Sequence, residues 1–171
     1  MNKYLFFGFI FLFYACDDGE LQIETLDFDA ATIQNCEVIE AGSANVLFKL
    51  NTTEALILEL SAAVLKNEIS DGPVAHLVTA SGATKVTYRT FSDNISNSYF
   101  CSDVPLTSPT VVEEIIAEAG SVFITTTAKA DSLTYEHEIQ LSGISLITSK
   151  DTRITDLSIN NFGTVITSLP E

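Results

Sequence analysis

The chain has 171 residues, with 8 Lys and Arg against 23 Asp and Glu, and a formal net charge of −15 at pH 7. So negative a protein repels the phosphates of nucleic acids, which argues against DNA or RNA as a partner. The length suits a single domain with a sizeable hydrophobic core.

The N-terminus has the pattern of an export signal. Lys3 is followed by eleven uncharged, mostly apolar residues, Tyr4 to Tyr14. A run of this length matches the core of a signal peptide and falls short of the roughly 20 residues that a transmembrane helix needs. Ala15-Cys16 follows directly. We therefore expect residues 1–15 to be a cleaved signal peptide.

A small residue and a cysteine at the end of a short apolar core resemble a bacterial lipobox. The resemblance implies that the sulfur of Cys16 carries a diacylglycerol, that cleavage falls just before it, and that the new N-terminus is acylated. Two or three acyl chains hold a protein stably at a membrane, whereas one chain holds it only marginally. The alternative is an ordinary secretory signal in which Cys16 is incidental.

Three acidic residues follow this cysteine: Asp17, Asp18 and Glu20. The run resembles the export tag of Bacteroidetes outer-membrane lipoproteins, which implies an address on the outer face of the outer membrane. The alternative is a solvated acidic tether without a targeting role. After cleavage the chain loses Lys3 and no acid, so 7 basic residues face 23 acidic ones and the formal charge becomes −16.

The cysteine count agrees with this address. The chain has three cysteines, and lipidation of Cys16 leaves Cys36 and Cys101 as a pair in an oxidising compartment. We expect a disulfide between them, with two buried free thiols as the alternative. The two histidines, His76 and His137, show no metal-ligand spacing with the cysteines, so no metal or other cofactor is expected.

Residues 16–30 are expected to form the lipidated, acidic tether. Four apolar residues are interspersed with its acids, so the second half should dock on the body: Leu21, Ile23, Leu26 and Phe28. We expect one β-sandwich domain over residues 31–171.

From about residue 31 the sequence is β-like. Apolar and polar residues alternate with the period of a strand, most clearly over 44–51 and 133–141. Turn signals such as Asp71-Gly72-Pro73 separate the runs. Further strands are expected over 55–60, 74–79, 85–91, 122–128, 144–148, 154–159 and 164–167, the last two as a terminal hairpin around 160–163. Eight or nine short strands predict an all-β antiparallel sandwich.

Two stretches also carry helical signals. Residues 54–65 are rich in Ala, Leu and Glu, as helices are, but Leu56, Leu58 and Leu60 alternate as in a strand, which we favour. Thr110-Val-Val-Glu113 fits a capping box, and Gly120 fits a helix end. We therefore expect the one short helix of the domain at 111–119, with Glu113 and Glu114 as solvated first-turn acids and not a catalytic pair.

Two single residues also carry a signal. His137 lies on the apolar face of its strand, where a hydrogen-bonded core or rim histidine is far commoner than a catalytic one. Asp131-Ser132-Leu133 resembles the O-glycosylation sequon of Bacteroidetes, which implies Ser132 as a modified residue.

The sequence shows no nucleophile elbow, metal motif or phosphate-binding loop, so an enzyme is not expected. The favoured interpretation is a lipid-anchored surface lipoprotein that acts as a non-catalytic binding or assembly module for an envelope protein or glycan. The alternative is a glycan-binding accessory lipoprotein of a polysaccharide uptake system. Sugar-binding platforms favour Trp and Tyr, and the chain has no Trp.

Overall fold

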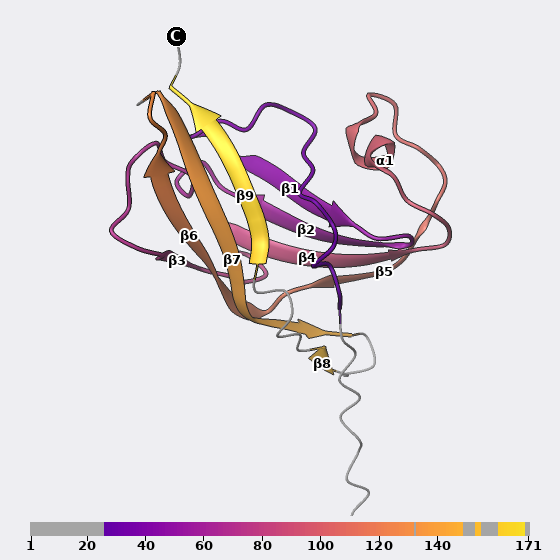
Figure 1. Ribbon diagram of the computed structural model, residues 1–171. Coiled ribbons are helices and arrows are strands. Elements are labelled where there is room, and N and C mark those ends of the chain that lie inside the picture. Colours follow the sequence, from indigo (N-terminus) through magenta and orange to yellow (C-terminus); the bar gives the residue numbers. More distant parts are fainter. Residues whose placement is uncertain (1–25, 132, 149–152, 155–160, 170–171) are drawn as a thin grey trace, which may run out of the picture.

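The described residues of the computed structural model are 26–131, 133–148, 153–154 and 161–169. They form two antiparallel β-sheets packed on one another, with one short helix beside them (Figure 1). The expected all-β sandwich is confirmed. The predicted lipidation site, export tag and glycosylation site lie outside the described residues: Cys16, Asp17, Asp18, Glu20 and Ser132.

The first sheet has the order β1-β2-β4-β5. Its strands are β1 (Asn45–Leu50), β2 (Glu54–Leu60), β4 (Thr84–Phe91) and β5 (Val111–Ile116). The second sheet has the order β3-β6-β7, and both β8 and β9 pair with β7. Its strands are β3 (Val74–Leu77), β6 (Ala119–Ala128), β7 (Thr134–Ile147), β8 (Arg153–Ile154) and β9 (Asn161–Ser168).

The main core lies between the two sheets. From the first sheet it receives Leu56, Leu58 and Leu60 of β2, and from the second it receives Ile139 and Leu141 of β7, all at most 2% exposed. Alternate residues of a strand point to opposite faces, so one apolar set on each strand fills this layer. The strand that we favoured for 55–60 is confirmed as part of β2.

A second, smaller core covers the outer face of the first sheet. Here Ala55, Ile57 and Phe91 pack beneath α1 (Asn97–Cys101), the only helix of the described residues. Because both faces of β2 are covered, its sequence is apolar almost throughout, which explains why its strand alternation was ambiguous. No helix in the described part of the chain is long and apolar enough to cross a membrane.

The helix predicted at 111–119 is wrong, because residues 111–116 form β5. Glu114 lies opposite Arg89 of β4 and pairs with it, while Ile115 is buried in the main core. Four β-branched residues in six favour a strand over a helix. Gly120 marks the corner at which the chain passes from the first sheet to the second, and not a helix end.

The C-terminal prediction was also partly wrong. The chain continues through Gly143 as one long strand, which bends there at a positive φ of 62° (Figure 1). The bend lets residues 146–147 of β7 pair with β8, while residues 134–140 pair with β9. No β8–β9 hairpin ladder occurs among the described residues, and 161–163 belong to β9 instead of a turn.

Candidate functional site

The candidate site lies where the N-terminal segment, residues 26–36, passes the edges of both sheets. Leu26 and Phe28 are buried in the main core, which confirms that this end of the predicted tether docks on the domain. Gln34 exchanges two backbone hydrogen bonds with Phe48 of β1, at 2.8 and 2.9 Å. The segment thus covers part of an otherwise open strand edge.

A buried lysine holds this segment in place. Lys49 of β1 points into the sandwich, and only 4% of the residue is exposed. Its Nζ donates to the carbonyl of Phe28 at 3.0 Å and to that of Asn161, at the start of β9, at 3.4 Å. The same nitrogen lies 5.6 Å from the ring centroid of Phe162. Lys49 therefore joins three parts of the chain that are far apart in sequence.

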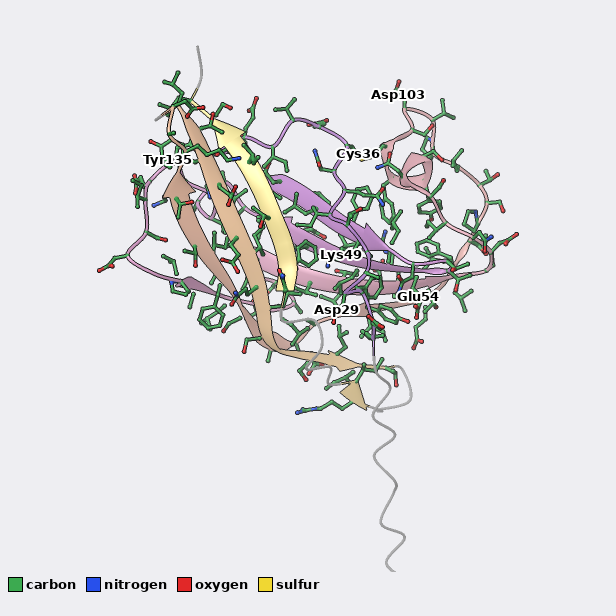
Figure 2. The ribbon with its side chains drawn as sticks, in the orientation of Figure 1. Asp29, Cys36, Lys49, Glu54, Asp103 and Tyr135 are labelled. Carbon is green, nitrogen blue, oxygen red and sulfur yellow. A yellow bond between two sulfur atoms is a disulfide. The ribbon has the colours of Figure 1, made fainter. Side chains whose placement is uncertain are left out.

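Beside Lys49 a cavity of about 730 Å³ opens to solvent. Figure 2 labels Lys49 between the sheets and Asp29 nearby on the N-terminal segment. The lining comes from the N-terminal segment, β1 and β9: Asp29, Ala31, Thr32, Ile33, Lys49, Asn161, Phe162, Gly163 and Thr164. Its volume is within the range of small-molecule sites.

The segment packs closely on β9 at Gly163. A Cβ there would lie 2.8 Å from Cδ1 of Ile33, the end of a side chain that can shift. The φ of Gly163 is 128°, which L side chains rarely adopt, so backbone conformation is the main reason that this position favours glycine.

Within the described part of the chain, the ammonium of Lys49 has no anionic partner in direct contact. No carboxylate oxygen of the described residues lies within 4.0 Å of Nζ, and both of its hydrogen-bond acceptors are neutral carbonyls. Burial lowers the pKa of Lys49 from its usual 10.5, and the charge of Asp29 acts in the opposite direction. An ammonium has three N–H groups, so one donor is left after these two bonds.

A second buried titratable residue, His137, forms part of a closed polar chain. Its Nδ1 lies 2.8 Å from the hydroxyl of Thr126, and its Nε2 lies 2.8 Å from the hydroxyl of Thr167, which donates to Asn67. His137 is fully buried, and burial lowers its pKa. Every polar atom of the ring has a partner, so the prediction of a hydrogen-bonded core histidine is confirmed.

The predicted disulfide is confirmed. Cys36 and Cys101 are bonded, with their Cα atoms 5.0 Å apart, and the bond joins the N-terminal segment to the end of α1. A smaller cavity of about 330 Å³ lies beside the bond, with Val38 and Val46 among its exposed apolar walls. The described residues contain no group of three or more His, Cys, Asp or Glu side chains that could hold a metal ion.

The two residues that flank the predicted glycosylation site, Asp131 and Leu133, lie between β6 and β7 and are exposed. The carboxylate of Asp131 accepts hydrogen bonds from the backbone of Leu133 and Thr134, both at 2.9 Å. Ser132 itself lies outside the described residues.

Sequence reasoning missed Lys49, which it placed only among the polar residues of an alternating strand. In the structure Leu47 and Lys49 face the main core, and Phe48 faces the helix. No sequence signal marked it, because the apolar residues Val46, Phe48 and Leu50 alternate with Lys49 and favour the opposite face as the inward one.

Comparisons with known proteins give no match: no family model, no curated protein and no solved structure is significantly similar to this chain.

Proposed function

We propose that the protein is a lipoprotein, anchored through Cys16 in the outer membrane and exposed at the cell surface, whose β-sandwich acts as a non-catalytic binding module. The observation that supports the anchor is the Cys36–Cys101 disulfide. It uses two of the three cysteines and is typical of an oxidising compartment. Cys16 is then the remaining cysteine, and it directly follows the apolar run of the signal peptide.

The binding role is supported by the cavity beside Lys49. Ligand sites are commonly concave, largely apolar and equipped with a few convergent polar groups. This cavity combines one buried cation with hydroxyl, amide and aromatic groups. It lies beside the segment that leads from the proposed anchor, so the body would present it close to its attachment point.

The anchor is tested by replacing its cysteine. The Cys16→Ala variant should move from the detergent phase to the aqueous phase in a phase-separation assay, and its N-terminus should carry no lipid mass. The matched control is the Cys36→Ala/Cys101→Ala double variant, which loses two cysteines and keeps the anchor. Unchanged membrane association of Cys16→Ala would rule the anchor out.

Surface exposure is tested separately. Replacing Asp17, Asp18 and Glu20 with Ala should protect the protein from protease added to whole cells. The control replaces three exposed acids of the body, Glu68, Asp71 and Glu118, and removes the same charge. Equal protease sensitivity of the two triple variants would contradict the export tag and leave the lipid anchor standing.

A further inference from the structure

Lys49 is the only cation among the residues that line the cavity, and its ammonium keeps one N–H after its two bonds to carbonyls. A buried charge is costly unless it is paired, and an anion supplies the strongest hydrogen bond to an ammonium. The free donor and the unpaired charge together favour an anionic ligand.

The walls restrict which anion fits. Thr32, Thr164 and Asn161 add hydroxyl and amide groups to the lining, which suit the hydroxyl groups of a ligand. Ile33 and Phe162 add apolar surface beside them. A purely aliphatic acid would make no hydrogen bond to these groups, so it would gain less from binding than a hydroxylated acid.

The negative charges of the protein restrict the ligand further. Asp29 lines the same cavity, and the chain as a whole carries a formal charge of −15. With a single cation at the site, a di- or polyanion such as inorganic phosphate or a sulfated polymer would be repelled. One negative charge on the ligand is the amount that Lys49 can neutralise.

We propose that the cavity beside Lys49 binds a small, hydroxylated monocarboxylate of the acidic-monosaccharide type, with the carboxylate on Lys49 and hydroxyl groups on the threonine and asparagine walls. This ligand assignment deepens the proposed binding function and depends on it. The cavity of about 730 Å³ has room for one or two sugar rings.

The test is a titration of the full-length protein in detergent, monitored by the NMR shifts of the backbone amides of 29–33 and 161–164. Four probes separate the contributions of charge and of hydroxyl groups to binding: glucuronate, glucose, acetate and inorganic phosphate. Glucuronate should move these amides and saturate with a Kd below about 10 mM. Acetate should bind several-fold more weakly, and glucose and phosphate should have no effect.

Two variants test the charge. Lys49→Met, which keeps the apolar stem, should weaken glucuronate binding by about tenfold or more, because a charge-assisted hydrogen bond is lost. Lys129→Met is the matched control, since Lys129 is a surface lysine paired with Glu136 at 3.4 Å, and it should bind like the parent. Asp29→Asn removes a negative charge from an exposed position and should tighten binding about two- to fivefold.

Asp29→Asn leaves the buried lysine in place, so it keeps the test informative if Lys49→Met fails to fold. The proposal is overturned if glucuronate moves none of these amides, if glucose or acetate binds equally well, or if Asp29→Asn weakens glucuronate binding. Because the titration does not depend on lipidation, a negative result here with an intact Cys16 anchor would remove the ligand and leave the lipoprotein proposal untouched.

Discussion

Phe48 on β1 and Phe100 on α1 stack on one another, with ring centroids 4.6 Å apart and planes at 28°. Phe100 directly precedes Cys101, whose bond to Cys36 ties the helix to the N-terminal segment. The stacked rings and the disulfide together hold the helix on the outer face of the first sheet. The structure therefore has a covalently fastened third layer over part of the outer face of the first sheet.

Removing the disulfide should lower stability without abolishing the fold. The bond joins residues 65 apart in sequence, for which the chain-entropy model gives about 4 kcal/mol. We expect the Cys36→Ala/Cys101→Ala variant to lose about 2–4 kcal/mol in urea unfolding, because the main core between the sheets remains. Mass spectrometry of unreduced peptides checks the pairing, and two free thiols in cell-derived protein would contradict it.

Truncating the stacked ring should loosen the third layer. Phe100→Ala removes the contact with Phe48 and with Phe91, whose ring centroid lies 6.4 Å away. Phe100 is half-buried, so we expect a loss of about 2 kcal/mol, less than for a fully buried Phe. Val104→Ala, at a residue that is 72% exposed in the following loop, should change stability by less than about 0.5 kcal/mol. Equal effects of the two variants would show that the ring of Phe100 adds no measurable stability.

Much of this fold could be predicted from the sequence because most strands bury one face. The alternation in 133–141 identifies β7, and the same period identifies β1. Alternation in one strand does not reveal which face is inward when both are covered. The third layer therefore hid the orientation of Lys49, since Phe48 is as buried as Leu47 on the opposite face.

The errors in the prediction have local causes. The capping-box pattern at 110–113 and Gly120 indicated a helix, but pairing of β5 with β4 outweighs those short-range signals. The two strands expected at 133–141 and 144–148 form the single strand β7, because partner strands hold both halves of it on either side of Gly143. The cavity itself could not be predicted, because it depends on contacts between residues more than 100 positions apart, such as Lys49 and Asn161.

Gly120 should be intolerant of a side chain. Its φ is 136°, and a Cβ would lie 2.7 Å from Cδ1 and 2.9 Å from Cα of Ile144. We expect Gly120→Ala to cost roughly 3 kcal/mol or more, from backbone strain and a clash with backbone that cannot move aside. Gly42→Ala is the control for strain alone, since Gly42 has a φ of 77° and open space around its Cβ, and should cost about 1 kcal/mol. Equal losses in thermal or urea unfolding would rule out the close approach.

The buried His137 makes the stability of the protein depend on pH. Burial holds the pKa of His137 below its usual 6.5, which favours the neutral imidazole in the folded protein. In that form Nε2–H donates to the hydroxyl oxygen of Thr167, which itself donates to Asn67, and Nδ1 accepts from Thr126. The unfolded chain therefore binds a proton that the folded chain does not. The stabilisation is present above pH 6.5 and is lost as the pH falls below that value.

We expect the urea midpoint of the parent protein to be lower at about pH 5 than at about pH 8. His137→Gln should be less stable at the higher pH, because it breaks the polar chain, but it should show a smaller fall. His76→Gln is the matched control: the pKa of His76 is also lowered, by burial and then by Lys66, so its removal tests the only other histidine. If His137→Gln loses as much stability on acidification as the parent does, the buried histidine is not the group that carries the pH dependence.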